Sequence, residues 1–313
     1  MNPQGGIRRR ALPAPAGRGR GLLSALVSAL LGLGCAGQAS AAAKGARGVQ
    51  FATVDGTPLL LDVYPAENGA KPLGLIVWVH GGAWRAGSRA SPDLLGLTSR
   101  GWALASVDYR LSTVARFPAQ VFDIKAALRH LRAHAPEYGV AGVPFVIAGS
   151  SAGAHLAALV GVSNGEGDLE GGVGSELKAS SAVQAIVSLY GASNLTSILG
   201  QSSPHGRSVR VPALELLLGG QPDAQPELAR LASPVFHVDA SDPPLLLLHG
   251  EQDDQMPVQQ SSELEAAYQK LALPVQLEVV PGAGHGGPVF TDAAHLDRID
   301  QFLRARLLGP KAE

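Results

Sequence analysis

The chain has 313 residues, a length that suits either one large α/β domain or two smaller domains. Hydrophobic residues make up 46% and charged residues 16%, which excludes a disordered chain, and the single cysteine, Cys35, excludes a disulfide framework and a cysteine metal site. The formal net charge is −1 and no long basic run follows residue 20, so the composition argues against nucleic acid as a partner.

The N-terminal segment has the pattern of a secretory signal. Residues 1–21 carry basic side chains and no acidic one, and an apolar stretch follows at 22–34. That stretch is shorter than the roughly 20 residues that span a bilayer, and small residues at 39–41 form a cleavage site. We therefore predict a signal peptide over residues 1–41 and a mature domain over 42–313. Cleavage lowers the 25 basic residues to 20, against 26 acidic ones, because it removes Arg8, Arg9, Arg10, Arg18 and Arg20.

Other interpretations of this segment remain open. Residues 32–35, Gly-Leu-Gly-Cys, loosely resemble a lipoprotein acylation site, which would anchor the protein to a membrane through Cys35. Arg9 and Arg10 faintly resemble a twin-arginine signal, and an arm that is never cleaved is a further alternative. The sequence thus predicts a secreted or periplasmic protein, with membrane association only if Cys35 is acylated.

The mature part alternates continuous apolar runs with helical patterns. Residues 49–54 and 58–64 are β-rich and flank Asp55-Gly56, a dipeptide typical of a hairpin turn. Unbroken apolar runs are typical of strands covered on both faces, and strands that alternate with helices predict a parallel sheet. We expect an α/β fold with a mostly parallel eight-stranded sheet and helices on both faces. The remaining strands are expected at 75–79, 103–107, 145–148, 183–189, 245–248 and 275–280.

Two stretches interrupt this alternation. Residues 161–181 are rich in Gly, Ser and acidic residues and are expected to form a loop, whereas 195–225 are expected to form a small cap over the carboxyl edge of the sheet. Ligands of open α/β sheets bind beyond the carboxyl ends of the strands, so residues that follow an apolar run are candidates for chemistry. Asp108, Arg110 and Asp123 are most simply interpreted as structural salt-bridge or loop-fixing residues, and a substrate contact by Arg110 is the alternative.

A candidate nucleophile follows the run at 145–148. Residues 149–153, Gly-Ser-Ser-Ala-Gly, match G-x-S-x-G and precede a helix-capable stretch, so a strand would turn sharply into a helix at Ser151. Such a turn holds the serine in a strained backbone conformation, with Gly on both sides giving room, and the helix N-terminus favours developing negative charge. The alternative is a simple helix-capping turn.

A serine hydroxyl needs a base and an orienting carboxylate to become nucleophilic. His285 lies in a Gly-rich loop after the last predicted strand, and Asp253 lies in the loop after the strand before it. The chain order of serine, acid and histidine is the one expected after a G-x-S-x-G turn. Asp254 and Glu251 compete with Asp253 as the acid, and spacing alone favours Asp253.

Residues 80–84, His-Gly-Gly-Ala-Trp, follow the third predicted strand and are candidates for an oxyanion hole. Acyl transfer develops negative charge on the carbonyl oxygen, which backbone N–H groups held in place beforehand stabilise. We expect these donors at Gly82, Ala83 and Ala152, and we expect His80 to fix the loop rather than to catalyse. A Gly-rich turn without a role is the alternative.

Six motifs in this order resemble one family. They are similar to the α/β-hydrolases of the hormone-sensitive-lipase type and, more narrowly, to the bacterial carboxylesterases grouped with the BD-type feruloyl and acetyl esterases. The similarity extends over residues 49–308 and implies the α/β-hydrolase fold. The motifs lie at residues 80–84, 108–112, 117–120, 149–156, 249–253 and 282–286.

This resemblance implies a serine carboxylesterase that works through an acyl-enzyme intermediate, without a cofactor or a metal. Ser151 would attack the ester carbonyl, His285 would move the proton, and Asp253 would orient His285. The resemblance also favours Asp253 over Asp254, because the family places its acid four residues after the histidine of the His-Gly pair, which here is His249.

The expected substrates are short-acyl or aromatic carboxylic esters, as small molecules or linked to a polysaccharide. Trp84 and Tyr190 are candidates for the substrate pocket. Ala83 stands where the family usually has Gly, which concerns substrate shape more than reaction type, and Asn194 stands where it usually has Asp. Two alternative functions are an arylformamidase-like amide hydrolase with the same triad and a catalytically silent binding module. The sequence does not indicate the oligomeric state.

Overall fold

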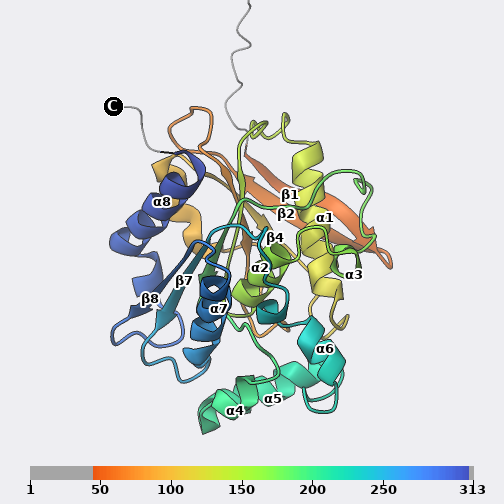
Figure 1. The fold of residues 1–313 in the computed structure, drawn as a ribbon. Coiled ribbons are helices and arrows are strands. Elements are labelled where there is room, and N and C mark those ends of the chain that lie inside the picture. Colours follow the sequence, from red (N-terminus) through yellow and green to blue (C-terminus); the bar gives the residue numbers. More distant parts are fainter. Residues whose placement is uncertain (1–44, 310–313) are drawn as a thin grey trace, which may run out of the picture. The chain divides into compact units, whose positions relative to one another are not determined.

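An eight-stranded sheet forms the middle layer of the fold (Figure 1). The computed structural model describes residues 45–309. The strand order is β1-β2-β4-β3-β5-β6-β7-β8, in which β1 (Ala46–Val54), β2 (Thr57–Tyr64) and β4 (Ala103–Val107) pair antiparallel. Every pair from β4 onward in this order is parallel. The prediction of a mostly parallel eight-stranded sheet is confirmed.

The hairpin between β1 and β2 turns at the predicted dipeptide. Asp55 has a φ of 49° and Gly56 a φ of 77°. Positive φ at both central residues is typical of the type I′ turn, whose twist matches that of the flanking strands. The antiparallel lead-in therefore follows from local turn chemistry.

The inner strands are buried along their whole length, because helices cover both faces of the sheet. In β3, Leu75, Val77 and Val79 pack into the core on one face, and Ile76 and Trp78 pack into the core on the other. Side chains of a strand alternate between faces, so a strand covered on both sides must be apolar throughout. The buried strands besides β4 are β3 (Leu75–Val79), β5 (Phe145–Ser150), β6 (Ala185–Leu189) and β7 (Leu245–Gly250). The edge strand β8 (Val275–Val280) is only partly buried.

Helices lie on both faces, as predicted. On one face, α1 (Ala119–Ala133), α2 (Ala152–Val162) and α7 (Gln259–Lys270) contribute side chains to the larger core. On the other face, η1 (Asp93–Arg100) and α8 (Ala293–Leu307) contribute to the second core. Figure 1 shows α8 and α7 on opposite sides of the strands.

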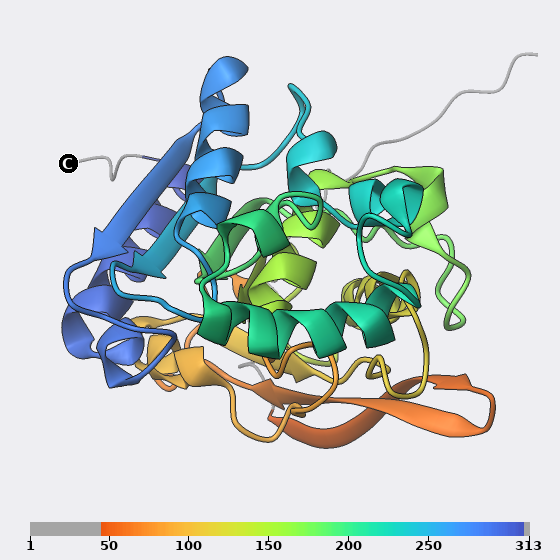
Figure 2. The same ribbon diagram turned by 90° about the horizontal axis from the view of Figure 1, so that it is seen from below.

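The predicted cap corresponds to two helices at one end of the sheet, α4 (Ile198–Gln201) and α5 (Pro204–Leu218). In the view of Figure 2, α5 crosses the front of the protein. Two short helices, α6 (Pro226–Leu231) and η2 (Pro234–Phe236), follow before β7. The stretch predicted as a loop is irregular except for the single turn α3 (Gly167–Glu170).

The N-terminal segment and the question of a membrane-spanning helix are separate from the sheet. The predicted signal peptide, residues 1–41 with Cys35, lies outside the described residues. Among the helices of residues 45–309, none combines the length and apolar character needed to cross a bilayer.

A buried ion pair fixes the loop after β4 to α1. The Asp123 carboxylate is fully buried and accepts hydrogen bonds from the Arg110 backbone N–H at 2.9 Å, from Nε at 2.8 Å and from Nη2 at 2.8 Å. This geometry agrees with the structural interpretation of both residues. Together the bonds satisfy both carboxylate oxygens, which is what a buried charge requires.

Replacing Asp123 with alanine is expected to lower the free energy of unfolding by about 3–5 kcal/mol, because it leaves the Arg110 guanidinium without its partner. Urea denaturation of the purified protein measures this change. As a matched control, Arg298→Ala removes the exposed Arg298–Glu278 pair and is expected to cost less than about 1 kcal/mol. Equal losses in the two variants would contradict the assignment.

Candidate active site

Ser151 lies at a sharp turn between β5 and α2. Its backbone has a φ of 53° and a ψ of −117°, a strained conformation for a residue with a side chain. The flanking glycines are required by close packing: a Cβ at Gly153 would lie 2.1 Å from the Val79 carbonyl oxygen, and one at Gly149 would lie 2.4 Å from the Gly153 oxygen. The turn therefore presents Ser151 at the carboxyl edge of the sheet, with a helix N-terminus behind it.

The structure brings Ser151, His285 and Asp253 into one hydrogen-bonded chain. The Ser151 Oγ lies 2.8 Å from His285 Nε2, and His285 Nδ1 lies 2.7 Å from Asp253 Oδ2. With the imidazole proton on Nδ1, the ring donates to the carboxylate and its Nε2 accepts from the serine hydroxyl. This arrangement can transfer the serine proton to the histidine and stabilise the resulting imidazolium.

Asp253 is held in its charged form by its surroundings. Its Oδ1 accepts from the backbone N–H groups of Gln255 at 3.0 Å and Met256 at 2.7 Å, and His249 Nε2 lies 3.4 Å from Oδ2. Burial acts to raise the pKa of Asp253, but the hydrogen bonds from His249, His285 and Met256 outweigh it and hold the pKa well below its usual range. A permanently ionised acid is therefore available to His285.

The two competing acids lie elsewhere. Asp254 is exposed, and the Glu251 carboxylate accepts from the backbone N–H of Gly282 at 2.9 Å. Neither makes a hydrogen bond with His285 in the part of the chain that the structure describes. The hydrogen-bond geometry therefore favours Asp253 as the acid, as the spacing did.

The loop at 80–84 places backbone donors beside Ser151. Within residues 45–309, the N–H groups of Gly82, Ala83 and Ala152 have no internal hydrogen-bond acceptor. Gly82 and Ala83 line the cavity at Ser151. Ala152 directly follows Ser151 as the first residue of α2, and its side chain is buried. Ala83 has a φ of 51°, a conformation that favours glycine, so its backbone is strained. This is the position at which the family that the motifs resemble usually has Gly. Free donors at this point suit an oxyanion.

His80 and Tyr109 hold this loop in place. The His80 ring donates from Nδ1 to the Gly81 carbonyl at 2.8 Å, and the Tyr109 hydroxyl donates to the His80 carbonyl at 3.0 Å. The two rings stack with centroids 4.4 Å apart. Burial lowers the pKa of His80, which favours the neutral ring. These contacts agree with the expected role of His80 in fixing the loop.

Trp84 lies elsewhere than expected. It was a candidate for the substrate pocket, but its side chain is fully buried in the core and is not part of the cavity at Ser151. Its Nε1 donates to His155 Nδ1 at 3.1 Å, and His155 Nε2 donates to the Ala232 carbonyl at 2.6 Å. Complete burial lowers the pKa of His155 to about 4, so the ring is neutral and Nδ1 can accept. Trp84 therefore links the loop at 80–84 to His155 of α2 through a buried hydrogen bond.

Tyr190 does line the cavity, as expected. Its ring makes an edge contact with the His285 ring at a centroid distance of 5.0 Å, and another with Phe290 of η3 (Pro288–Thr291) at 4.7 Å. Burial raises the pKa of Tyr190 to about 12, so its hydroxyl stays protonated at neutral pH. The contact with Tyr190 restricts the orientation of the His285 imidazole.

Asn194, which stands where the family usually has Asp, donates from Nδ2 to the Glu263 carboxylate at 2.7 Å.

The cavity at Ser151 has a volume of about 420 Å³. Three polar side chains that the motifs did not indicate also line it: Arg85, Arg210 and Gln255. Arg85 directly follows the 80–84 loop, which is a signal that could have indicated it. Arg210 lies on cap helix α5, where no motif surrounds it.

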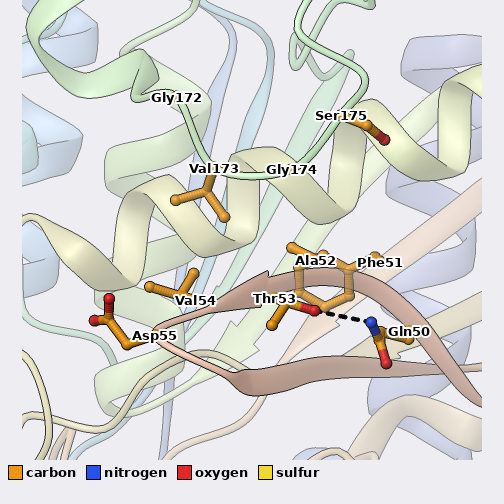
Figure 3. Close-up of a pocket in the computed structure, with 10 residues that line it drawn as sticks. All are labelled: Gln50, Phe51, Ala52, Thr53, Val54, Asp55, Gly172, Val173, Gly174 and Ser175. Carbon is orange, nitrogen blue, oxygen red and sulfur yellow. Dashed lines mark hydrogen bonds between the residues drawn. The ribbon is translucent and has the colours of Figure 1, made fainter.

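A larger hollow, of about 700 Å³, lies away from this site. Figure 3 shows it between β1 and residues 172–175, lined on one side by residues 50–55. It contains no histidine or cysteine, and Asp55 at the hairpin turn is its one acidic residue. Within residues 45–309, no three His, Cys, Asp or Glu side chains are grouped as metal ligands. This hollow therefore offers no alternative to the hydrogen-bonded chain at Ser151 as a catalytic site.

A model of the BD-FAE family matches residues 61–268 of the chain. The chain belongs to the BD-FAE family. The match confirms the resemblance that the motifs indicated, and it spans Ser151 and Asp253 although it ends before His285. BD-FAE membership also agrees with the α/β-hydrolase fold of the sheet.

Relatives in sequence and structure carry esterase names. Esterases LipC and LipQ of Mycobacterium tuberculosis are 34% and 32% identical, over 72% of this chain but only 56% and 53% of their own lengths, so the chain spans about half of each. A truncated carbohydrate esterase from gut microbiota has a TM-score of 0.76 at 29% identity, covering 86% of this chain and 98% of that one. Est2, a thermophilic esterase of Thermogutta terrifontis, has a TM-score of 0.68 at 27% identity, covering 88% and 96%; it is also described with propionate bound.

Proposed function

We propose that this protein is a serine carboxylesterase that hydrolyses short-acyl or aromatic carboxylic esters through an acyl-enzyme intermediate. The observation that carries the proposal is the continuous chain Ser151–His285–Asp253, with its distances of 2.8 and 2.7 Å, at the wall of a cavity. Membership of the BD-FAE family and the esterase names of the relatives support the same reaction class.

Acylation would begin when the Ser151 Oγ attacks the ester carbonyl carbon and passes its proton to His285 Nε2. The carbonyl π electrons move to the oxygen, and the N–H groups of Gly82, Ala83 and Ala152 are placed to bind that oxyanion. When the intermediate collapses, the bond to the alcohol oxygen breaks and His285 gives its proton to the leaving alcohol. Asp253 stabilises the imidazolium throughout.

Deacylation would repeat these steps with water as the nucleophile. His285 takes a proton from water as the water oxygen attacks the acyl carbon, and the same N–H groups bind the second oxyanion. Collapse breaks the bond to Ser151 Oγ, which regains its proton from His285. The products are one carboxylic acid and one alcohol, and the enzyme returns to its starting state.

The size of the cavity and the relatives support small acyl groups. A space of about 420 Å³ that also holds the alcohol part leaves little room for a long chain. Est2, which is described with propionate bound, and the carbohydrate esterase from gut microbiota are among the similar structures. Short acyl esters on sugars are therefore part of the proposal. A separate part, based on the N-terminal sequence, is that the protein is exported after removal of residues 1–41.

A panel of p-nitrophenyl esters from acetate to palmitate tests this proposal, run beside acetylated xylan and methyl ferulate. We expect kcat/KM to be highest for acetate to butyrate and to fall steeply beyond about ten carbons, because a cavity of about 420 Å³ encloses a short acyl group more completely than a long one. Cleavage restricted to the long-chain esters would contradict the proposed specificity, and no cleavage of any ester would contradict the proposed function. N-terminal sequencing of the exported protein tests the cleavage site.

A further inference from the structure

Two arginines face the cavity at Ser151, and no acidic side chain lines it. Arg85 directly follows the loop at 80–84 and is half-buried, whereas Arg210 lies on cap helix α5 and is completely buried. Within residues 45–309, neither guanidinium makes a salt bridge with a carboxylate. The charged side chains that line this cavity are thus both cationic, while Asp93 lines an adjoining hollow that shares Gly81, Gly82 and Ser150 with it.

The hydrogen-bonding capacity of Arg210 is largely unused. Its Nε donates to the Gln255 carbonyl over a long 3.4 Å, and its buried Nη1 has no partner among the residues that the structure describes. The Trp84 ring centroid lies 5.9 Å from the guanidinium carbon, near the limit at which a cation and a ring attract. Burial lowers the pKa of Arg210 to about 10, so the side chain remains charged at neutral pH.

Other buried cations of this fold do have carboxylate partners. Lys125 and Arg129, whose side chains are also almost completely buried, both pair with Glu170. The acid whose charge acts on Arg210 is Asp253, which is already engaged by His285 and two backbone N–H groups. A buried charge normally requires a partner, so the missing partner of Arg210 points to a group that arrives with the substrate.

Arg210 is also held where such a group would meet it. The helix that carries it packs against the loop that carries Asp253: the Ser203 Oγ donates to the Asp254 carbonyl at 2.7 Å, and a Cβ on Gly206 would lie 3.0 Å from the carbonyl oxygens of Asp254 and Gln255. These contacts hold α5 against the loop after β7. The guanidinium is therefore prepositioned in the wall of the catalytic cavity.

We propose that Arg210, assisted by Arg85, binds a carboxylate that the substrate carries close to its scissile ester. The preferred substrates would then be acidic esters, with the carboxylate on the acyl part, as in monoesters of dicarboxylic acids, or on the alcohol part, as in acylated sugar acids. A guanidinium and a carboxylate form paired, charge-assisted hydrogen bonds, which suits the free donors of Arg210. This inference rests on the proposed esterase function and narrows its substrate class.

The test compares anionic esters with neutral ones of the same shape. Monoethyl succinate against ethyl succinamate varies the charge on the acyl side, and 4-acetoxybenzoate against 4-acetoxybenzamide varies it on the alcohol side. We expect the wild-type protein to show a higher kcat/KM for the anionic member of one pair, and that pair identifies the side that Arg210 binds. Equal or lower values for the anionic member of both pairs would overturn the inference.

Variants then assign the preference to one residue. In Arg210→Gln, the ratio of kcat/KM for anionic over neutral ester is expected to fall at least about 10-fold, the size of a lost hydrogen bond to a charged group. The matched control is Arg207→Gln, which removes a charge from the exposed side of the same helix, where Nη1 donates to the Leu199 carbonyl. This control is expected to keep the ratio within about twofold.

The two proposals fail in different ways. An unchanged ratio in Arg210→Gln would overturn the role of Arg210 while leaving the esterase function intact. Turnover of neither member of either pair, together with no turnover in the p-nitrophenyl panel, would overturn the esterase function itself. Should Arg210→Gln fail to fold, the ester pairs in the wild-type protein can still overturn the inference, because equal or lower kcat/KM values for both anionic esters would exclude carboxylate binding at this site.

Discussion

Replacing Ser151 with alanine is expected to lower kcat for p-nitrophenyl acetate by about 10⁴- to 10⁶-fold. The variant lacks the Oγ that attacks the carbonyl and accepts the acyl group, so only the oxyanion donors and substrate binding would remain to accelerate the reaction. Steady-state kinetics on freshly purified protein measure the loss. Circular dichroism and thermal melting establish that the variant keeps its fold.

A matched control and a labelling experiment sharpen this prediction. Ser262→Ala removes an exposed serine on α7 and is expected to keep kcat within about twofold. A fluorophosphonate probe is expected to label the wild-type protein at Ser151 and to leave Ser151→Ala unlabelled. Full turnover by Ser151→Ala would contradict the mechanism, and an unlabelled, inactive wild-type protein would favour the catalytically silent binding module instead.

Replacing Asp253 with asparagine is expected to lower kcat by about 10⁴-fold with little change in fold. An asparagine Oδ1 can still accept from the N–H groups of Gln255 and Met256, so the loop geometry survives. Its amide group cannot stabilise the His285 imidazolium, and it favours the tautomer in which Nε2 carries the proton and cannot accept from Ser151. The loss should therefore appear in kcat for every ester of the panel.

The neighbouring residue provides the control. Asp254→Asn changes an exposed carboxylate that is adjacent in sequence, and its backbone carbonyl, which accepts from Ser203, stays in place. We expect this variant to remain within about twofold of the wild-type kcat. A similar loss in both variants would mean that general loop damage or net charge, rather than the Asp253–His285 contact, explains the effect.

The positions of the strands could be predicted closely because burial on both faces imposes a continuous apolar run. The runs at 75–79 and 103–107 coincide with strands β3 and β4, and β6 begins two residues later than the predicted start at 183. The edge strand β8 also spans its predicted range, 275–280, although it is only partly buried and includes Gln276 and Glu278. The strands β5 and β7 extend two residues beyond the predicted runs, into Gly149-Ser150 and His249-Gly250. Those extra residues are polar or small because they lie at the carboxyl edge, where the site requires them.

Motifs could indicate Ser151, Asp253 and His285 because each stands in a loop of recognisable composition directly after a strand. The side chains whose position depends on distant partners could not be predicted in this way. Trp84 resembled a pocket residue by its place after the Gly-rich loop, yet its hydrogen bond to His155, 71 residues away in sequence, draws it into the core. Nothing in the sequence around Arg210 distinguishes it from the exposed Arg207 on the same helix.

The order of apolar runs, turn residues and Gly-rich loops was thus sufficient to predict the α/β architecture and to indicate the residues proposed to react, because these features are local. A strand, a tight turn and a loop each impose their own residue types. Which side chains surround the substrate was decided only by packing. The cap helix α5 and the loop at 80–84 come from segments more than a hundred residues apart. The burial of Arg210 without a carboxylate partner arises only when those segments meet over the carboxyl edge of the sheet.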